Sequence, residues 1–212
     1  MTEFAFSKEK RNQEIEDLGQ RELNLDRLFV LLLGPSATGK STVIRHLIER
    51  VSNPAFEYVK PMMTRPNRPK ETDKLSISKT EFEVMKRQRQ FVTTNDLYGV
   101  RYGTPLQGIL GPLGQGRVPI LDYPLATVGA LRRPEYDLLN FYIYPESTRS
   151  WTNRVIECGR NAGGRLESGT EELGSLATAG FVHPDIDVHM VNHNGKSAQT
   201  AKEILEIVQA VT

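Results

Sequence analysis

Residues 28–42 read LFVLLLGPSATGKST, and the architecture of the chain follows from this stretch. Its first six residues, Leu28 to Leu33, are all apolar, which predicts a parallel strand that is buried on both faces. Apolar side chains then recur at helical spacing from Lys40 to Val51, which predicts a helix. A strand, a glycine-rich turn and a helix therefore follow one another directly.

The turn, Gly34 to Ser41, matches the pattern G-x-x-x-x-G-K-[ST] in the structural context that this pattern requires. Backbone N–H groups of such a loop point at phosphate oxygens, and the helix N-terminus adds positive potential. We expect Lys40 to bridge the β- and γ-phosphates of ATP and the Ser41 hydroxyl to bind Mg²⁺. The residues predicted to hold the donor phosphates are Gly34, Pro35, Ser36, Ala37, Thr38, Gly39, Lys40, Ser41 and Thr42.

Three later segments predict further strands, Val118 to Leu121, Leu138 to Tyr144 and Val188 to Val191, each followed by a turn or a helical stretch. This alternation predicts an α/β fold, namely a P-loop three-layer architecture with a mainly parallel sheet. A length of 212 residues suits one such core, which we place at residues 27–212. Residues 1–26 are mostly charged and predict an extension that is partly disordered or docked on the surface, or else an interaction helix.

Two regions interrupt the alternation. Residues 52–116 are richer in Pro, Thr, Arg and Gly, and they predict an inserted acceptor-binding region with one helix at 79–90. Residues 146–180 predict a small mobile lid that consists of a helix at 146–158, a glycine-rich break at 159–164 and a second helical stretch.

Charged side chains at three places are candidates for the chemistry. Asp122 ends a predicted strand at the sheet edge where ligands of open α/β folds collect, although it could simply cap the strand. Arg65 and Arg68 lie in a loop stiffened by two prolines, which suits a phosphate monoester, although a solvated basic loop fits the same residues. The lid region also carries four arginines that could neutralise the γ-phosphate or simply lie on the surface: Arg149, Arg154, Arg160 and Arg165.

Composition excludes several other function classes. The 27 Lys and Arg residues balance 26 Asp and Glu residues, so we expect no nucleic acid partner and no anionic membrane partner. The single cysteine, Cys158, cannot form an internal disulfide, which favours a reducing, cytoplasmic setting. The apolar run at 28–33 is far shorter than the roughly 20 residues that span a bilayer, so we expect a soluble protein.

Several sequence blocks occur in the order in which guanylate kinases have them, so the chain resembles that family over roughly Leu28 to Val208. The blocks are GPSATGKST, TRPNRP, TEFEVM followed by QFV, LYGVRYGTP, VPILD, and VN before the last helix. The resemblance implies a kinase that uses ATP and Mg²⁺ and phosphorylates a small-molecule acceptor, most simply a nucleoside monophosphate. The spacing near Arg154 is off register with the family, whereas Arg160 and Arg165 match its lid arginines.

The resemblance also implies roles in substrate binding. Arg65, Arg68 and Tyr102 match contacts to the acceptor phosphate, and Asn192 matches a contact to the donor adenine. The candidates for acceptor binding are Arg65, Arg68, Glu71, Thr93, Tyr102 and Thr104.

The acceptor side departs from the family pattern. Pro61 stands where the family has a serine, Thr93 replaces the acid expected after QFV, and Pro124 replaces the second acid of a D-x-D strand end. We therefore predict that GMP is a poor or non-exclusive acceptor. The connection between Glu71 and Phe82 is several residues shorter than in the family, and with its LSIS stretch it also resembles ribose 1,5-bisphosphate kinases. A sugar phosphate is therefore an alternative acceptor. A non-catalytic binding module is a second alternative, against which the intact Lys40 and Ser41 argue.

Overall fold

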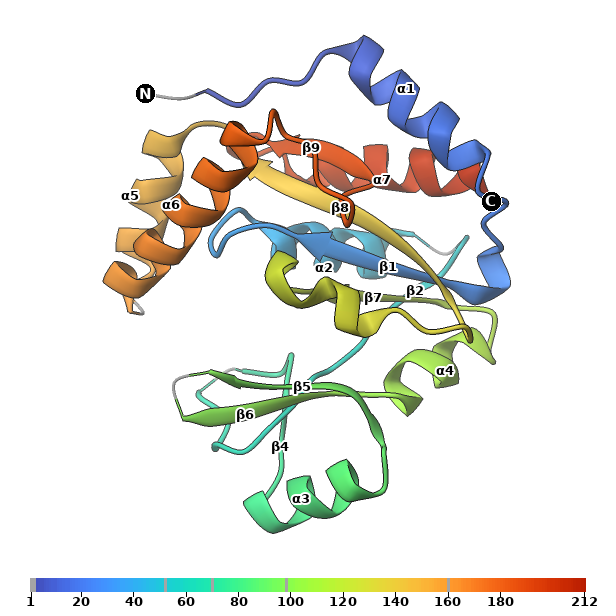
Figure 1. Ribbon diagram of the computed structural model, residues 1–212, viewed down its shortest axis with the longest axis vertical. Helices are drawn as coiled ribbons and strands as arrows, with labels where there is room; N and C mark the ends of the chain where they lie inside the picture. The colour runs from blue at the N-terminus through green and yellow to red at the C-terminus, as the bar shows by residue number, and fades with distance from the viewer. Residues whose placement is uncertain (1–2, 52, 70, 98, 160) are drawn as a thin grey trace.

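The computed structural model describes residues 3–51, 53–69, 71–97, 99–159 and 161–212. Its central strands are β1 (Leu28–Leu33), β2 (Phe56–Tyr58), β7 (Val118–Asp122), β8 (Asp137–Pro145) and β9 (Val188–Asn192). They form one parallel sheet in the order β2-β7-β1-β8-β9 (Figure 1). The predicted α/β fold with a mainly parallel sheet is confirmed, and the predicted strands differ from the observed ones by at most one residue at either end.

Helices cover both faces of this sheet. They are α1 (Lys8–Gly19), α2 (Lys40–Arg50), α4 (Gln107–Leu113), α5 (Thr148–Glu157), α6 (Ala162–Thr178) and α7 (Ser197–Val211), with short 3-10 helices η1 (Leu25–Arg27) and η2 (Leu125–Leu131). One more helix, α3 (Lys79–Arg87), lies away from this sheet. None of these helices combines the length and the apolar character needed to cross a membrane, in so far as the chain is described.

β1 lies at the centre of three layers. Its six side chains are completely buried, and alternate ones point to opposite faces because successive residues of a strand do. The even-numbered residues pack in one hydrophobic cluster with α2 and α7. The odd-numbered residues pack in a second cluster with α4, η2, α5 and α6. The apolar run at 28–33 is therefore explained by burial on both sides.

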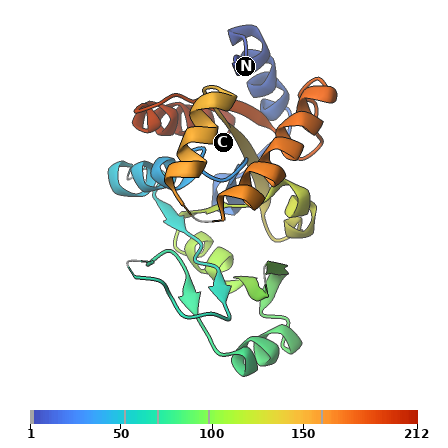
Figure 2. The ribbon, with the colours of Figure 1, turned by 90° about the vertical axis from the view of Figure 1, so that its left-hand side faces the viewer.

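A second, smaller sheet lies beside the central one. It consists of β3 (Met62–Met63), β4 (Leu75–Ser76), β5 (Phe91–Leu97) and β6 (Val100–Pro105) in the order β4-β3-β6-β5. β6 pairs antiparallel with both β3 and β5. Figure 1 shows this sheet and α3 below the central sheet, and Figure 2 shows them below the pair α5 and α6.

The inserted region has narrower limits than the predicted 52–116. β2 pairs with β7 in the central sheet, and α4 packs against β7, so both belong to the central layer. The separate sheet spans residues 62–105. The sequence does not predict α4 because Gly108, Gly111 and Pro112 all lower its helix propensity.

Three helix boundaries also differ from the prediction. α3 ends before Arg89, whose φ of 55° cannot continue a right-handed helix. α5 begins at Thr148, where Ser147 and Ser150 form a reciprocal capping box. α6 begins at Ala162, so the break is shorter than predicted, and Gly163 and Gly164 lie in the first helical turn.

The N-terminal extension is docked on the core along its described part. Ser7 caps α1 by accepting a hydrogen bond from the Lys10 backbone N–H at 3.1 Å. α1 packs against α7 and β9, and Leu18 inserts into the cluster on that face with 2% of its surface exposed. An ion pair of 2.7 Å between Arg11 and Glu203 fixes the two helices together.

Replacing Leu18 with Ala should lower the free energy of unfolding by roughly 2–5 kcal/mol, because it removes a buried side chain and leaves a cavity. Urea unfolding of the two proteins measures this difference. Leu75→Ala, at a position with 43% exposure, is the matched control and should change stability little. A stability change near zero for Leu18→Ala would show that the extension does not depend on this contact.

Candidate active site

The phosphate-binding loop follows β1 and depends on two glycines. Gly34 has φ of +120°, and a Cβ there would lie 2.6 Å from the Ile143 carbonyl oxygen. Gly39 has φ of +92°, and a Cβ there would collide with the Asn192 side chain. Both positions therefore require glycine, because other residues rarely adopt these angles and the neighbouring strands leave no room.

The side chain of Lys40 folds back onto the backbone of this loop. Its Nζ atom donates hydrogen bonds to the carbonyl oxygens of Gly34 at 2.6 Å and Pro35 at 2.7 Å. Burial lowers the pKa of Lys40, while the carboxylates of Asp122 and Glu172 act in the opposite direction. The ammonium group thus lies inside the loop, within the electrostatic reach of two acids.

α5 and α6 pack directly onto the same loop. The Trp151 indole N–H donates to the Ser36 carbonyl oxygen at 2.8 Å. Gly169 of α6 lies so close to Trp151 that a Cβ would overlap the indole ring, and the same Cβ would be 3.1 Å from Pro35. Glu172, one turn further, accepts a hydrogen bond of 2.5 Å from the Tyr142 hydroxyl. The predicted lid is therefore in contact with the loop that it was expected to cover.

The lid arginines differ in their surroundings. The Nε and Nη2 atoms of Arg154 are buried and have no hydrogen-bond partner among the described residues. Burial lowers the pKa of Arg154, and Glu146 opposes this effect. Arg165 contributes a positive charge near Lys40 and donates to the Cys158 sulfur at 3.6 Å. Arg149 is exposed, and Arg160 lies outside the described residues.

The unpaired donors of Arg154 matter because a buried guanidinium without partners is unfavourable. An anionic group beside Arg154 would supply the missing acceptors. The glycine loop and Lys40 suit a bound polyphosphate, and Arg154 is a further cation on the helix that packs on this loop.

Asp122 ends β7 beside the loop, as predicted. It accepts a hydrogen bond of 2.7 Å from the Tyr58 hydroxyl of β2, and the pKa of Tyr58 is raised by burial and by this carboxylate. Ser41 is the second residue of α2, and its side chain is exposed. Throughout the described ranges there is no cluster of three or more His, Cys, Asp or Glu side chains that could hold a metal.

Arg65 and Arg68, the predicted arginine pair, do not present two equivalent guanidinium groups, because Arg65 is already paired. Arg65 forms a bidentate ion pair with Glu71, with both N···O distances at 2.7 Å. Glu71 and, to a smaller degree, Tyr102 raise the pKa of Arg65. The pair lowers the pKa of Glu71 to about 2. The Arg68 backbone N–H also donates to Glu71, whereas its side chain is exposed. Arg65 still has an unpaired, buried Nε atom.

A neutral polar cluster lies between the second sheet and the end of β7. The hydroxyls of Thr93 and Tyr123 are 2.8 Å apart, and Thr93 is 3.4 Å from the Thr104 hydroxyl. Asn95 donates to the Tyr123 hydroxyl at 3.2 Å. Thr93 and Thr104, both predicted acceptor residues, are therefore brought together, and they are linked to the central sheet through Tyr123.

Residues 26–207 match the sequence profile of the family described as guanylate kinase. The chain belongs to the guanylate kinase family. It is 28% identical over 191 residues to a guanylate kinase of Nostoc sp., a match that covers 87% of this chain and 92% of the relative. A guanylate kinase of Symbiobacterium thermophilum is 32% identical over 135 residues, or 62% of this chain and 63% of the relative.

A solved structure shows the same fold. The crystal structure of guanylate kinase from Anaplasma phagocytophilum has a TM-score of 0.58 at 15% identity, and the match covers 89% of this chain and 88% of that chain. The TM-score and coverage establish that the guanylate kinase fold is shared.

The guanylate kinase resemblance assigns Asn192 to the donor adenine, but the structure uses its side chain differently. Asn192 is 1% exposed, and its Nδ2 atom donates to the Thr38 carbonyl oxygen at 2.8 Å. Its Oδ1 atom accepts from the Thr200 hydroxyl at 3.1 Å. Both ends of the amide are thus occupied, so Asn192 ties the phosphate loop to β9 and α7 and is not available to a base.

Several residues of this guanylate kinase site escape prediction from sequence. They are Trp151, Gly169, Glu172, Asn95 and Tyr123. Trp151 could have been singled out from the sequence, because it is the only tryptophan in the chain. No local sequence signal marks the other four, and only their positions in the fold bring them to the site.

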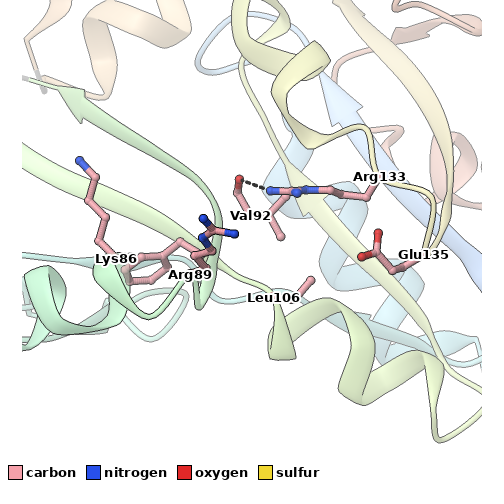
Figure 3. A pocket seen from close by; sticks show the side chains of 7 residues that line it. Lys86, Arg89, Val92, Leu106, Arg133 and Glu135 are labelled. Carbon is pink, nitrogen blue, oxygen red and sulfur yellow. Dashed lines mark hydrogen bonds between the residues drawn. The ribbon is translucent and has the colours of Figure 1, made fainter.

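A cavity of about 340 Å³ lies apart from the phosphate loop. It is lined by Lys86, Arg89, Phe91, Val92, Leu106, Arg133 and Glu135. Figure 3 shows Arg89 and Arg133 turned toward one another across it, with Glu135 on the wall that carries Arg133. Arg133 precedes β8, whereas the loop follows β1. Because β1 and β8 are parallel, the two lie at opposite ends of the strands, so this cavity is not part of the candidate phosphate site.

Replacing Asn192 with Ala should lower the free energy of unfolding by about 1–3 kcal/mol, because the Thr38 carbonyl and Thr200 hydroxyl lose a buried partner. The preference for ATP over GTP as donor should not change. Urea unfolding and donor kinetics measure the two quantities. If the variant were as stable as wild type but had lost its preference for ATP, the hypothesis that Asn192 contacts the donor adenine would be supported instead.

Proposed function

We propose that this protein is an ATP-dependent phosphotransferase that moves the γ-phosphoryl group of Mg·ATP onto a phosphate monoester, with nucleoside monophosphates as the first class of acceptor. The observation that carries the proposal is Lys40, whose ammonium is held inside a glycine loop under a lid that supplies an unpaired Arg154. The family membership supports the same reaction class.

In the proposed reaction, backbone N–H groups within residues 36–41 bind the donor phosphates. Lys40 exchanges its contacts with the Gly34 and Pro35 carbonyls for the β- and γ-phosphate oxygens, and Arg154 and Arg165 neutralise charge as it develops. An oxygen of the acceptor phosphate attacks the γ-phosphorus, the bond to the β–γ bridging oxygen breaks, and ADP leaves. Bound Mg²⁺ would supply further charge neutralisation at the phosphate oxygens.

We assign the second sheet to the acceptor and the α5–α6 pair to the lid. Arg68 is free to meet the acceptor phosphate, and Arg65 is pre-oriented by Glu71 with its Nε atom still unpaired. Asp122 ends β7 within electrostatic reach of Lys40, and we assign it to orienting the acceptor. Positioning and charge neutralisation supply the catalysis, without a covalent enzyme intermediate.

The base-binding side has a specific chemical character in this proposal. Guanine presents two donors, N1–H and the N2 amino group, which carboxylates answer best. Here the positions hold Thr93 and Pro124, and the cluster around Tyr123 consists of hydroxyls and an amide, which both donate and accept. Glu71 cannot replace the missing acid, because both of its oxygens bind Arg65.

Two alternatives have less support. A non-catalytic binding module does not explain a retained Lys40, Ser41 and an unpaired buried Arg154. A sugar phosphate kinase has no support from the relatives reported above, which are described as guanylate kinases. We place the protein in a reducing compartment such as the cytoplasm, in keeping with the free, exposed thiol of Cys158.

Replacing Lys40 with Ala should reduce turnover by at least ~10²-fold, because the lost contact to the transferred phosphoryl group strengthens in the transition state. A coupled ADP-release assay measures turnover, and a thermal melt checks that the variant is folded. Lys202→Ala, at a side chain that is 74% exposed, is the matched control and should retain full activity. Near wild-type turnover in folded Lys40→Ala protein would rule out this assignment of the loop.

The acceptor preference follows from the neutral base cluster. Two lost charge-assisted hydrogen bonds at about 1.5–3 kcal/mol each should weaken guanine selectivity by roughly 10²- to 10⁴-fold relative to a pocket with two carboxylates. We therefore expect another phosphate monoester to match or exceed GMP in kcat/KM. The assay compares GMP, AMP, CMP, UMP, their deoxy forms and ribose 1,5-bisphosphate. A preference for GMP of ~100-fold over every other compound would contradict this expectation.

A further inference from the structure

We propose that residues 3–7, called the aromatic arm below, hold both ends of the α5–α6 lid and so position its charged side chains over the phosphate loop. The arm precedes the region matched to the guanylate kinase family, which begins at residue 26. The lid role of α5 and α6 rests on the proposed function, whereas the contacts of the arm do not.

The first end of the lid is the link between β8 and α5. Glu3 forms an antiparallel bridge with Ser147, and the Phe4 backbone N–H donates to the Glu146 carbonyl oxygen at 3.2 Å. Ser147 is also the N-cap of α5. The arm therefore pairs through its backbone with the two residues at which the chain enters the lid.

The second end of the lid is the turn after α6. Phe181 lies there with φ of +59°, a left-handed conformation that a bulky residue rarely adopts unless its surroundings hold it. Phe4 and Phe6 both meet its ring edge-on, with centroids 6.4 Å and 5.5 Å away. The arm thus covers the residue at which the chain leaves the lid.

The same rings fasten the arm to the central sheet. Phe6 packs on Tyr144 of β8 and His189 of β9, with centroid distances of 4.8 Å and 5.1 Å. Phe4 is 6% exposed and lies in the cluster that includes Trp151 and Leu173. One short segment therefore connects the rigid sheet to both ends of the lid.

The contacts of the arm determine where the side chains of the lid lie. Trp151, Arg154, Arg165 and Glu172 are all carried between the two ends that the arm holds. Removing the aromatic rings would allow the α5–α6 pair to tilt, and small displacements of charged groups around a reacting phosphate reduce turnover strongly. Phe4 and Phe6 are therefore positioning residues, because they act through the lid.

The test compares wild type with the double variant Phe4→Ala/Phe6→Ala. We expect kcat/KM for ATP to fall by at least ~10-fold, while KM for the acceptor stays within about twofold, because the contacts of the arm given above are with the lid and the central sheet. Amide hydrogen exchange of residues 148–178 should accelerate by at least ~10-fold. Phe4→Leu/Phe6→Leu should restore most of both quantities, since leucine retains much of the apolar contact.

Leu18→Ala is the matched control, since Leu18 belongs to the same extension but packs on the opposite face of the sheet. It should leave exchange in residues 148–178 unchanged for those amides that exchange by local opening and not by global unfolding. Equal effects of the two variants on the lid, or unchanged exchange in Phe4→Ala/Phe6→Ala, would overturn the proposal. Absence of phosphotransfer in the wild-type protein would instead refute the proposed function, and the exchange measurement would still test the arm. If the double variant does not fold, the single variant Phe6→Ala is compared with wild type in the same kinetic and exchange measurements.

Discussion

The parallel pairing of β1 with both β7 and β8 is the constraint on which the site depends. Its register sets Leu32 opposite Asp122 on one side and Leu33 opposite Tyr142 on the other. The phosphate loop, the carboxylate of Asp122 and the hydroxyl that binds Glu172 therefore meet at one edge of the sheet. Because a shift of one residue in β1 would exchange its two hydrophobic faces, the packing of both layers fixes this register.

Polar contacts around the loop serve mainly to hold its backbone. The Ser36 and Thr38 carbonyls accept from Trp151 and Asn192, and the Pro35 carbonyl accepts from Lys40. These donors come from the lid, from β9 and from the loop itself. Side-chain donors thus satisfy three loop carbonyls, which fixes the conformation of the loop backbone.

How much could be predicted from the sequence depended on the kind of signal. β1 and α2 were predicted to within one residue, because an unbroken apolar run and helical periodicity reflect burial directly. α4 was missed since tertiary packing overrides its poor propensity. Lys40 and Asp122 were predicted as site residues from their places relative to a strand, whereas the pairing of Arg65 with Glu71 and the contacts of Asn192 depend on side-chain geometry that no spacing reveals.

The contact between Trp151 and the loop has a practical consequence. This indole is the only one in the chain, it is 2% exposed, and its N–H rests on the Ser36 carbonyl while its ring lies against Gly169 of the lid. Indole emission responds to the polarity and hydrogen bonding around the ring. The protein therefore contains a built-in fluorophore at the junction of its loop and lid, and its emission follows that junction without any attached label.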